Sequence, residues 1–186
     1  SSQVPAALDR LGFPDDAWDA IVTSGDAIRG ELTRRAPGPV LRLGRDGDRG
    51  LWEGLGLEFV ADPDHARFAA IAGLRTTEET PADYASILRA ARDRDLELLC
   101  ANPDLQIVSG GTLRWCAGAV ADSYSALGGR VVQAGKPHAA IYVRAFEALA
   151  AVAARVIPRE RVLAIGDGPS TDLLGANRQG LDALFI

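Results

Sequence analysis

Hydrophobic positions along this chain follow two patterns that alternate from one end to the other. Short apolar runs of four or five residues are typical of strands, and stretches in which apolar residues recur every three or four positions are typical of helices. The strand-like runs occupy residues 19–23, 40–44, 57–60, 68–72, 96–100, 131–134, 161–165 and 182–186, and helical patterns follow most of them. Strands that alternate with helices predict an α/β fold with a mainly parallel sheet.

Local signals mark two further elements. Thr80 precedes Pro81, and Asp83 follows, which is the pattern of an N-cap, a proline in the first helical position and an acidic first turn. A helix is therefore predicted to begin there. Two short apolar stretches, 106–108 and 112–116, flank Ser-Gly-Gly, and this arrangement predicts a β-hairpin.

Composition narrows the class of protein. The 186 residues are 47% hydrophobic and 24% charged, with a net charge of -5 and a pI near 5.0, which indicates a globular domain rather than a disordered one. An acidic chain argues against nucleic acid or an anionic membrane as the main partner, since both need a basic face. Cys100 and Cys116 lie in apolar runs and are predicted to be buried thiols, which suits a reducing cytoplasm.

Lysine occurs once, at Lys136, and the other 19 of the 20 basic residues are arginine. Lys136 follows a strand-like run and precedes Pro137, which opens a helical pattern. Arginine carries a planar guanidinium group, whereas lysine carries a compact ammonium group on a flexible side chain. A compositional bias toward arginine could leave a single lysine by chance. A functional role for Lys136 can therefore be inferred only from the residues that lie near it in the fold.

Polar groups gather where predicted strands meet helices, which is where open α/β sheets bind their ligands. Ser24 and Gly25 follow the first strand-like run and open a helix, whose free N–H groups suit an anion. Ser24 as a simple N-cap is the alternative. Asp167 and Asp172 follow the run 161–165, and such a carboxylate pair suits Mg²⁺. Their alternative role is to cap the loop and to meet the helix macrodipole.

The order of these residues resembles the haloacid dehalogenase superfamily. Ser24 matches its second motif, Lys136 its third, and Asp167 with Asp172 its fourth. The local sequence is similar to the class IIA, NagD-like phosphatase branch at Val22–Asp26, Cys100–Asp104, Gly135–His138 and Gly166–Ala176. Lys136 follows Ser24 by 112 positions, and this gap matches the place of that branch's inserted cap domain.

The resemblance implies a Rossmann-like core with a parallel sheet and an inserted α/β cap of the C2 type. It places the core in residues 1–60 and 135–186 and the cap in residues 61–134. It implies a Mg²⁺-dependent hydrolase of small phosphorylated metabolites that works through an aspartyl-phosphate, with a homodimer left open. The implied site comprises Lys136 and Ser24 as catalytic residues, Gly25, Asp26, Asn102 and Asp104 as further phosphate or substrate contacts, and Asp167 and Asp172 as metal ligands. For Asn102 and Asp104, a simple Asn-Pro-Asp turn is an equal alternative.

The family's first motif, an Asp-x-Asp that supplies the nucleophile and the general acid/base, has no match before Ser24. Later Asp-x-Asp pairs at 46/48, 62/64 and 93/95 break the family's order and are predicted to be loop or helix-end acids. The strand that carries the motif is central in this fold. We therefore expect the natural polypeptide to begin upstream and the first core strand to be missing from these residues.

Two other classes of protein remain as alternatives. A non-catalytic relative could bind a phosphorylated ligand with Ser24, Lys136 and Asp167 while lacking a nucleophile. A dinucleotide-binding protein is disfavoured, because the glycines at 54 and 56 follow no strand and open no periodic helix.

Overall fold

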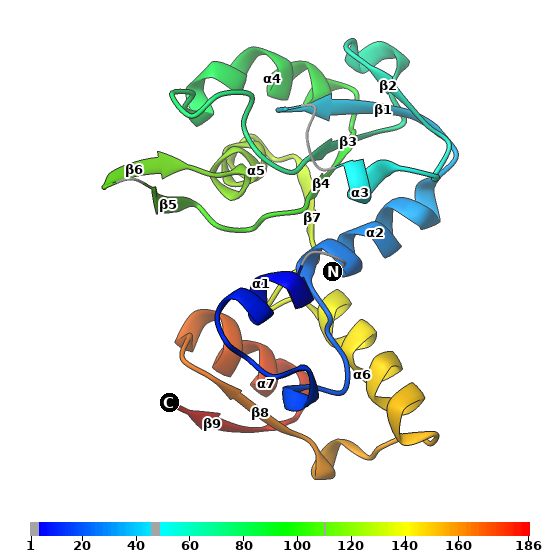
Figure 1. Cartoon of the computed structure of the whole chain (residues 1–186). Helices are drawn as coiled ribbons and strands as arrows, with labels where there is room; N and C mark the ends of the chain where they lie inside the picture. The colour runs from blue at the N-terminus through cyan, green and yellow to red at the C-terminus, as the bar shows by residue number, and fades with distance from the viewer. Residues whose placement is uncertain (1–3, 46–48, 110) are drawn as a thin grey trace. The chain divides into compact units, whose positions relative to one another are not determined.

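The computed structural model describes residues 4–45, 49–109 and 111–186 (Figure 1). The chain divides into two compact units. One unit combines the residues up to Ala27 with Gly135–Ile186, and the other is Ile28–Ala134. The Asp-x-Asp pair at 46/48 lies outside the described residues.

A five-stranded parallel sheet forms the centre of the unit 28–134. Its strand order is β2-β1-β3-β4-β7. The strands are β1 (Gly38–Leu43), β2 (Leu57–Val60), β3 (Phe68–Ile71), β4 (Glu97–Cys100) and β7 (Arg130–Gln133). All four residues of β3 are buried, because a central strand of a parallel sheet is covered on both faces.

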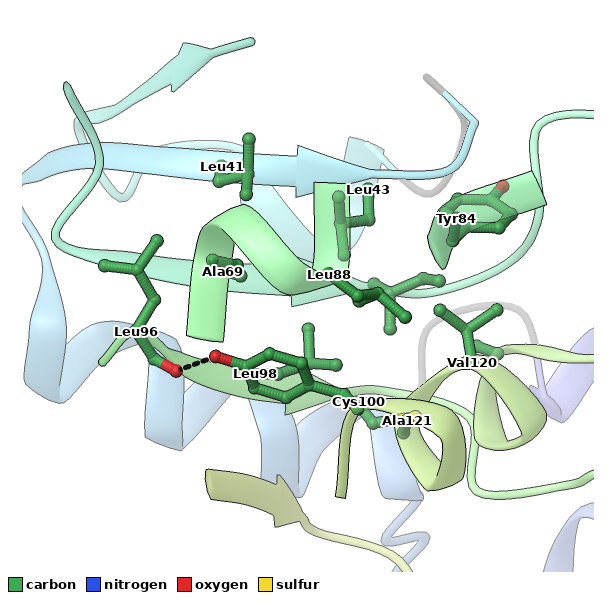
Figure 2. Packing of buried hydrophobic residues seen from close by; sticks show 14 of the residues in the cluster. Leu41, Leu43, Ala69, Tyr84, Leu88, Leu96, Leu98, Cys100, Val120 and Ala121 are labelled. Carbon is green, nitrogen blue, oxygen red and sulfur yellow. Dashed lines mark hydrogen bonds between the residues drawn. The ribbon is translucent and has the colours of Figure 1, made fainter. Parts of the chain in front are cut away.

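Helices α4 (Ala85–Asp93) and α5 (Ala117–Ala126) complete the core of this unit. Helix α5 packs against β4, β7 and α4. Figure 2 shows Leu98 and Cys100 of β4 packed with Val120 and Ala121 of α5. The buried hydroxyl of Tyr124 donates a 2.5 Å hydrogen bond to the Leu96 carbonyl (Figure 2), so its polar atom is satisfied inside an apolar cluster.

The predicted helix start and hairpin are both confirmed. The Thr80 N–H and hydroxyl donate to Asp83 at 2.8 and 2.9 Å, at the start of the short helix η3 (Pro81–Tyr84) that leads into α4. Strands β5 (Gln106–Ser109) and β6 (Thr112–Trp115) pair antiparallel. Two shorter helices, α3 (Arg49–Trp52) and η2 (Pro63–His65), lie in the connections between strands.

The unit formed by the two ends of the chain carries the remaining elements. It contains α1 (Val4–Arg10), η1 (Asp15–Ala17), the start of α2 (Ser24–Arg35), α6 (Ala139–Ala153), η4 (Arg159–Arg161), β8 (Leu163–Gly166), the π-helical turn η5 (Pro169–Leu173), α7 (Leu174–Gln179) and β9 (Asp182–Phe185). Strands β8 and β9 pair in parallel, and α7 packs against both α6 and β9 (Figure 1).

The strand predicted at residues 19–23 is wrong. This segment leads into α2 without strand structure, and no strand of the described residues pairs with it. An apolar run becomes a strand only when a neighbouring strand takes up its backbone hydrogen bonds.

Strands β1 and β2 belong to the five-stranded sheet, since β1 pairs with both β2 and β3. Arg29 of α2 donates to the carbonyls of Gly50 and Glu53 at 2.9 and 2.7 Å, which fastens the helix to the same unit. The compact unit 28–134 therefore contains all of the predicted cap, residues 61–134, together with a segment that was predicted to belong to the core. No helix among the described residues is long and apolar enough to cross a membrane.

Candidate active site

Lys136 makes an ion pair with Asp172 inside the unit formed by the chain ends. Lys136 lies between the end of β7 and the start of α6, and Asp172 lies in the turn that follows β8. The Lys136 side chain is 48% exposed and that of Asp172 only 13%. The carboxylate is therefore anchored in the protein, while the ammonium can also meet a ligand from solvent.

The backbone at the end of β8 lies close to the Asp172 side chain. The Gly168 N–H donates to the Asp172 Oδ2 at 3.1 Å. A Cβ on Gly166 would lie 2.4 Å from the Asp172 Cγ, so only glycine fits at the end of β8. The hydrogen bond from the Lys136 ammonium, helped by the Gly168 N–H and opposed by burial, holds the pKa of Asp172 below its usual value. Asp172 therefore stays ionised and keeps Lys136 in place.

Asp167 stands exposed at the carboxyl end of β8, between two glycines. The described residues contain no group of three or more His, Cys, Asp or Glu side chains that could hold a metal ion. Mg²⁺ needs fewer, because it binds through one or two carboxylates and fills its other positions with water and phosphate. The exposed Asp167 fits that demand, whereas the carboxylate of Asp172 is already engaged by Lys136 and Gly168.

Ser24 is the first residue of α2, and Thr23 is the residue that caps the helix. The Asp26 N–H donates to the Thr23 hydroxyl at 3.2 Å, and the Thr23 N–H and hydroxyl donate back to the Asp26 carboxylate at 2.8 and 2.7 Å. This capping box does not use the Ser24 hydroxyl or the N–H groups of Ser24 and Gly25, which can therefore meet a ligand. The cap of the helix is Thr23 rather than Ser24.

The predicted phosphate contact by Asp26 gains no support from this geometry. Its N–H is taken by the Thr23 oxygens, and its carboxylate accepts from the same residue. Burial opposes its ionisation, but these hydrogen bonds hold the pKa of Asp26 below its usual value. An ionised carboxylate repels phosphate, so the contacts of Asp26 serve the helix start.

Asn102 and Asp104 form a turn in the other unit. The Asp104 N–H donates to the Asn102 side-chain oxygen at 3.1 Å, and the Gly118 N–H donates to the Asp104 carbonyl at 3.1 Å. The Asn-Pro-Asp turn is therefore present, and it leaves the Asp104 side chain exposed. A part in substrate binding remains a proposal for both residues.

The cysteine prediction is confirmed. Cys100 and Cys116 are both buried free thiols. Burial raises the pKa of Cys100 to about 12, so this thiol stays protonated and unreactive.

The sequence placed Lys136 and Asp172 at one site but did not point to three residues that hold the segments around the predicted site residues. Thr23 could have been found, because Thr-x-x-Asp is the pattern of a capping box. Tyr142 and Gly175, which lie in contact on α6 and α7, left no signal in the pattern. Among the described residues, no hydrogen bond or ion pair joins Ser24 to Lys136 or Asp172, although all three belong to one unit.

Comparison with known proteins gives two kinds of match. The family model described as HAD-hydrolase-like matches residues 133–186. A crystal structure of a haloacid dehalogenase-like hydrolase from Brucella suis 1330 is 38% identical, with a TM-score of 0.84, and the match covers 98% of this chain and 71% of that one. No curated protein matches the chain.

Two further enzymes with a similar structure are phosphatases. Glycerol phosphate phosphatase from Mycobacterium tuberculosis, in complex with calcium, is 26% identical with a TM-score of 0.69; the match covers 98% of this chain and 52% of that one. The same enzyme is also known in complex with magnesium. A p-nitrophenyl phosphatase from Archaeoglobus fulgidus is 21% identical with a TM-score of 0.73, over 99% of this chain and 67% of that one, which shows a shared fold.

Proposed function

Because the chain belongs to the haloacid dehalogenase-like hydrolases, as its motifs predicted, we propose that its protein hydrolyses phosphate monoesters of small metabolites. The observation that carries the proposal is the ion pair between Lys136 and Asp172 beside the exposed Asp167. A cation, an accessible carboxylate and an ionised carboxylate at strand ends suit phosphoryl transfer, which depends on positioning and charge neutralisation.

Each residue of this unit takes a separate task in the proposed reaction. Lys136 binds the phosphoryl oxygens and neutralises their charge, while Asp172 holds the ammonium in place. The Ser24 hydroxyl and the N–H groups of Ser24 and Gly25 donate to the same phosphoryl group, aided by the positive end of the α2 dipole.

A divalent cation fits beside these residues. Asp167 would hold it, with the carboxylate of Asp172 close by, and the cation would supply further neutralisation of the phosphate charge. The calcium and magnesium complexes of the mycobacterial phosphatase support this choice of metal class. The attacking aspartate of the family's mechanism has no counterpart before Ser24 in this sequence.

The class IIA, NagD-like branch and a small-metabolite substrate belong to the same proposal. The p-nitrophenyl phosphatase and glycerol phosphate phosphatase matches support both. Asn102 and Asp104, in the proposed cap of residues 61–134, are the candidate substrate-selecting residues.

Phosphate release from a panel of metabolite monoesters and p-nitrophenyl phosphate tests the proposal, with full-length protein and added Mg²⁺. We expect turnover that chelation abolishes. Asp167→Asn should lower kcat by about 10²-fold or more, because a neutral amide is a weak ligand for a hard cation.

Glu160→Gln serves as the matched control. Glu160 is an exposed carboxylate of η4, so its neutralisation should leave kcat at the wild-type value. Binding of phosphorylated metabolites without any turnover would instead favour the non-catalytic alternative. Turnover that survives in Asp167→Asn would contradict the assigned metal ligand.

A further inference from the structure

A contact between α6 and α7 brings a tyrosine ring onto the helix that follows Asp172. Tyr142 lies in the first turn of α6, and Gly175 is a buried residue of α7. A Cβ on Gly175 would lie 2.1 Å from the Tyr142 hydroxyl oxygen and 2.9 Å from its Cζ. The phenol therefore rests on the Gly175 backbone, and a methyl group there would force one of the two helices, or the ring, to move.

This contact joins the same two segments that the ion pair joins. Lys136 precedes Tyr142 by six positions on one segment, and Asp172 precedes Gly175 by three on the other. The segments 136–142 and 172–175 thus meet at two points, the ammonium with the carboxylate and the phenol with the glycine. Burial and the nearby carboxylate of Asp172 both raise the pKa of Tyr142, so the ring stays neutral beside the pair.

The ion pair between Lys136 and Asp172 is too weak and too flexible to fix the distance between these segments. Lys136 is half exposed and has a flexible four-carbon stem, and exposed ion pairs of that kind contribute little to stability. A ring packed on a helix backbone is stiff, because close-packed atoms resist both approach and separation. The stiffer contact is the one that fixes how far Lys136 must reach.

We propose that Tyr142 is a positioning residue, which through its contact with Gly175 sets the distance between Asp172 and Lys136 and so aims the ammonium at the phosphate. The role in aiming rests on the proposed phosphatase function. The effect of Tyr142 on the distance between Asp172 and Lys136 does not depend on that function, so the spacing and the phosphatase activity can be tested separately. The task belongs to the packing of the ring and not to a hydrogen bond of its hydroxyl, since both Cζ and the hydroxyl oxygen lie against bare backbone.

Four variants of the full-length protein test the proposal: Gly175→Ala, Tyr142→Phe, the double variant Tyr142→Leu/Gly175→Ala, and Asn177→Ala as an exposed control on α7. Gly175→Ala should lower kcat by about 10-fold to 10²-fold, because small misplacements of a catalytic group have costs of that order. The double variant relieves the clash but lacks the ring that sets the spacing, so it should recover only part of the loss. Tyr142→Phe, which keeps the ring, and Asn177→Ala should stay near wild type.

A readout independent of activity comes from Lys136 itself. After reductive ¹³C-methylation, the Lys136 signal is assigned by its loss in Lys136→Arg. We expect Gly175→Ala to shift this signal in the same direction as Asp172→Asn, and the double variant to return it toward the wild-type position.

An unshifted lysine signal with wild-type kcat in Gly175→Ala would overturn the proposal, as would a double variant that recovers neither. A large loss in Tyr142→Phe would also overturn it, because the hydroxyl would then act directly. If wild-type protein releases no phosphate, the proposed function fails, while the lysine signal still decides whether the contact sets the spacing.

Discussion

Lys136→Ala is expected to lower kcat for phosphate release by about 10²- to 10³-fold, which is the loss seen when one donor to a developing charge is removed from an active site. The lysine is the cation that the structure places against Asp172, and its half-exposed ammonium can meet a phosphoryl group. Removing it leaves the ionised Asp172 facing the phosphate without compensation. Steady-state kinetics at saturating substrate measure the effect.

Two further variants sharpen this result. Lys136→Arg keeps the charge but replaces a compact ammonium with a planar fork, so kcat should also fall, by less than in Lys136→Ala. Arg144→Ala removes an exposed cation of α6 that pairs with Glu147 at 2.9 Å, and kcat should stay at the wild-type value. Equal losses in Lys136→Ala and Arg144→Ala would show a general charge effect and contradict the assigned role.

Gly118→Ala is expected to destabilise the unit 28–134 by about 3 kcal/mol or more, which is the upper range for overpacking a well-packed site. A Cβ on Gly118 would lie 2.1 Å from the Pro103 carbonyl oxygen and 2.5 Å from that of Asp104. Both are backbone atoms, so no side chain can turn away. The change should shift the chemical denaturation midpoint downward with an unchanged m-value.

Gly25→Ala is the matched glycine control. Its Cβ would meet only the Thr23 hydroxyl oxygen, at 3.4 Å, which is ordinary contact. Alanine favours a helix over glycine by up to about 1 kcal/mol, so this variant should be as stable as wild type or more so. A Gly118→Ala protein with wild-type stability would mean that α5 and the Asn102–Asp104 turn separate readily.

The spacing of hydrophobic residues predicted most of the fold, because it indicates which side chains become buried. The period of the buried positions differs between strands and helices. The run 68–71 became a fully buried central strand, and Thr80 with Asp83 marked a helix start through local hydrogen bonds. The run 19–23 failed because strand formation depends on a partner strand, which periodicity cannot supply. For the same reason, the pattern could not tell that β1 joins the sheet of β3 and β4.

The site was predictable in its residue types and only partly in its geometry. Lys136 and Asp172 follow different strands and were expected at one site, and the structure pairs them. Asp26 was expected at the phosphate because of the family resemblance, whereas the Thr-x-x-Asp pattern at 23–26 already indicated the pairing of its carboxylate with Thr23. The contact of Tyr142 with Gly175 depends on how two helices pack, and helix packing leaves no mark in a short motif.

Lys136, Ser24 and Asp167 are proposed to form one phosphate site, and anomalous diffraction from crystals of the full-length protein with tungstate and Mg²⁺ can locate the bound anion. Tungstate mimics the phosphoryl group, and its anomalous signal locates it without any prior assumption about the site. We predict one strong peak within hydrogen-bond distance of the Lys136 ammonium and the Ser24 hydroxyl, with the cation bound to Asp167. A peak elsewhere, with Lys136 still paired only to Asp172, would contradict the account.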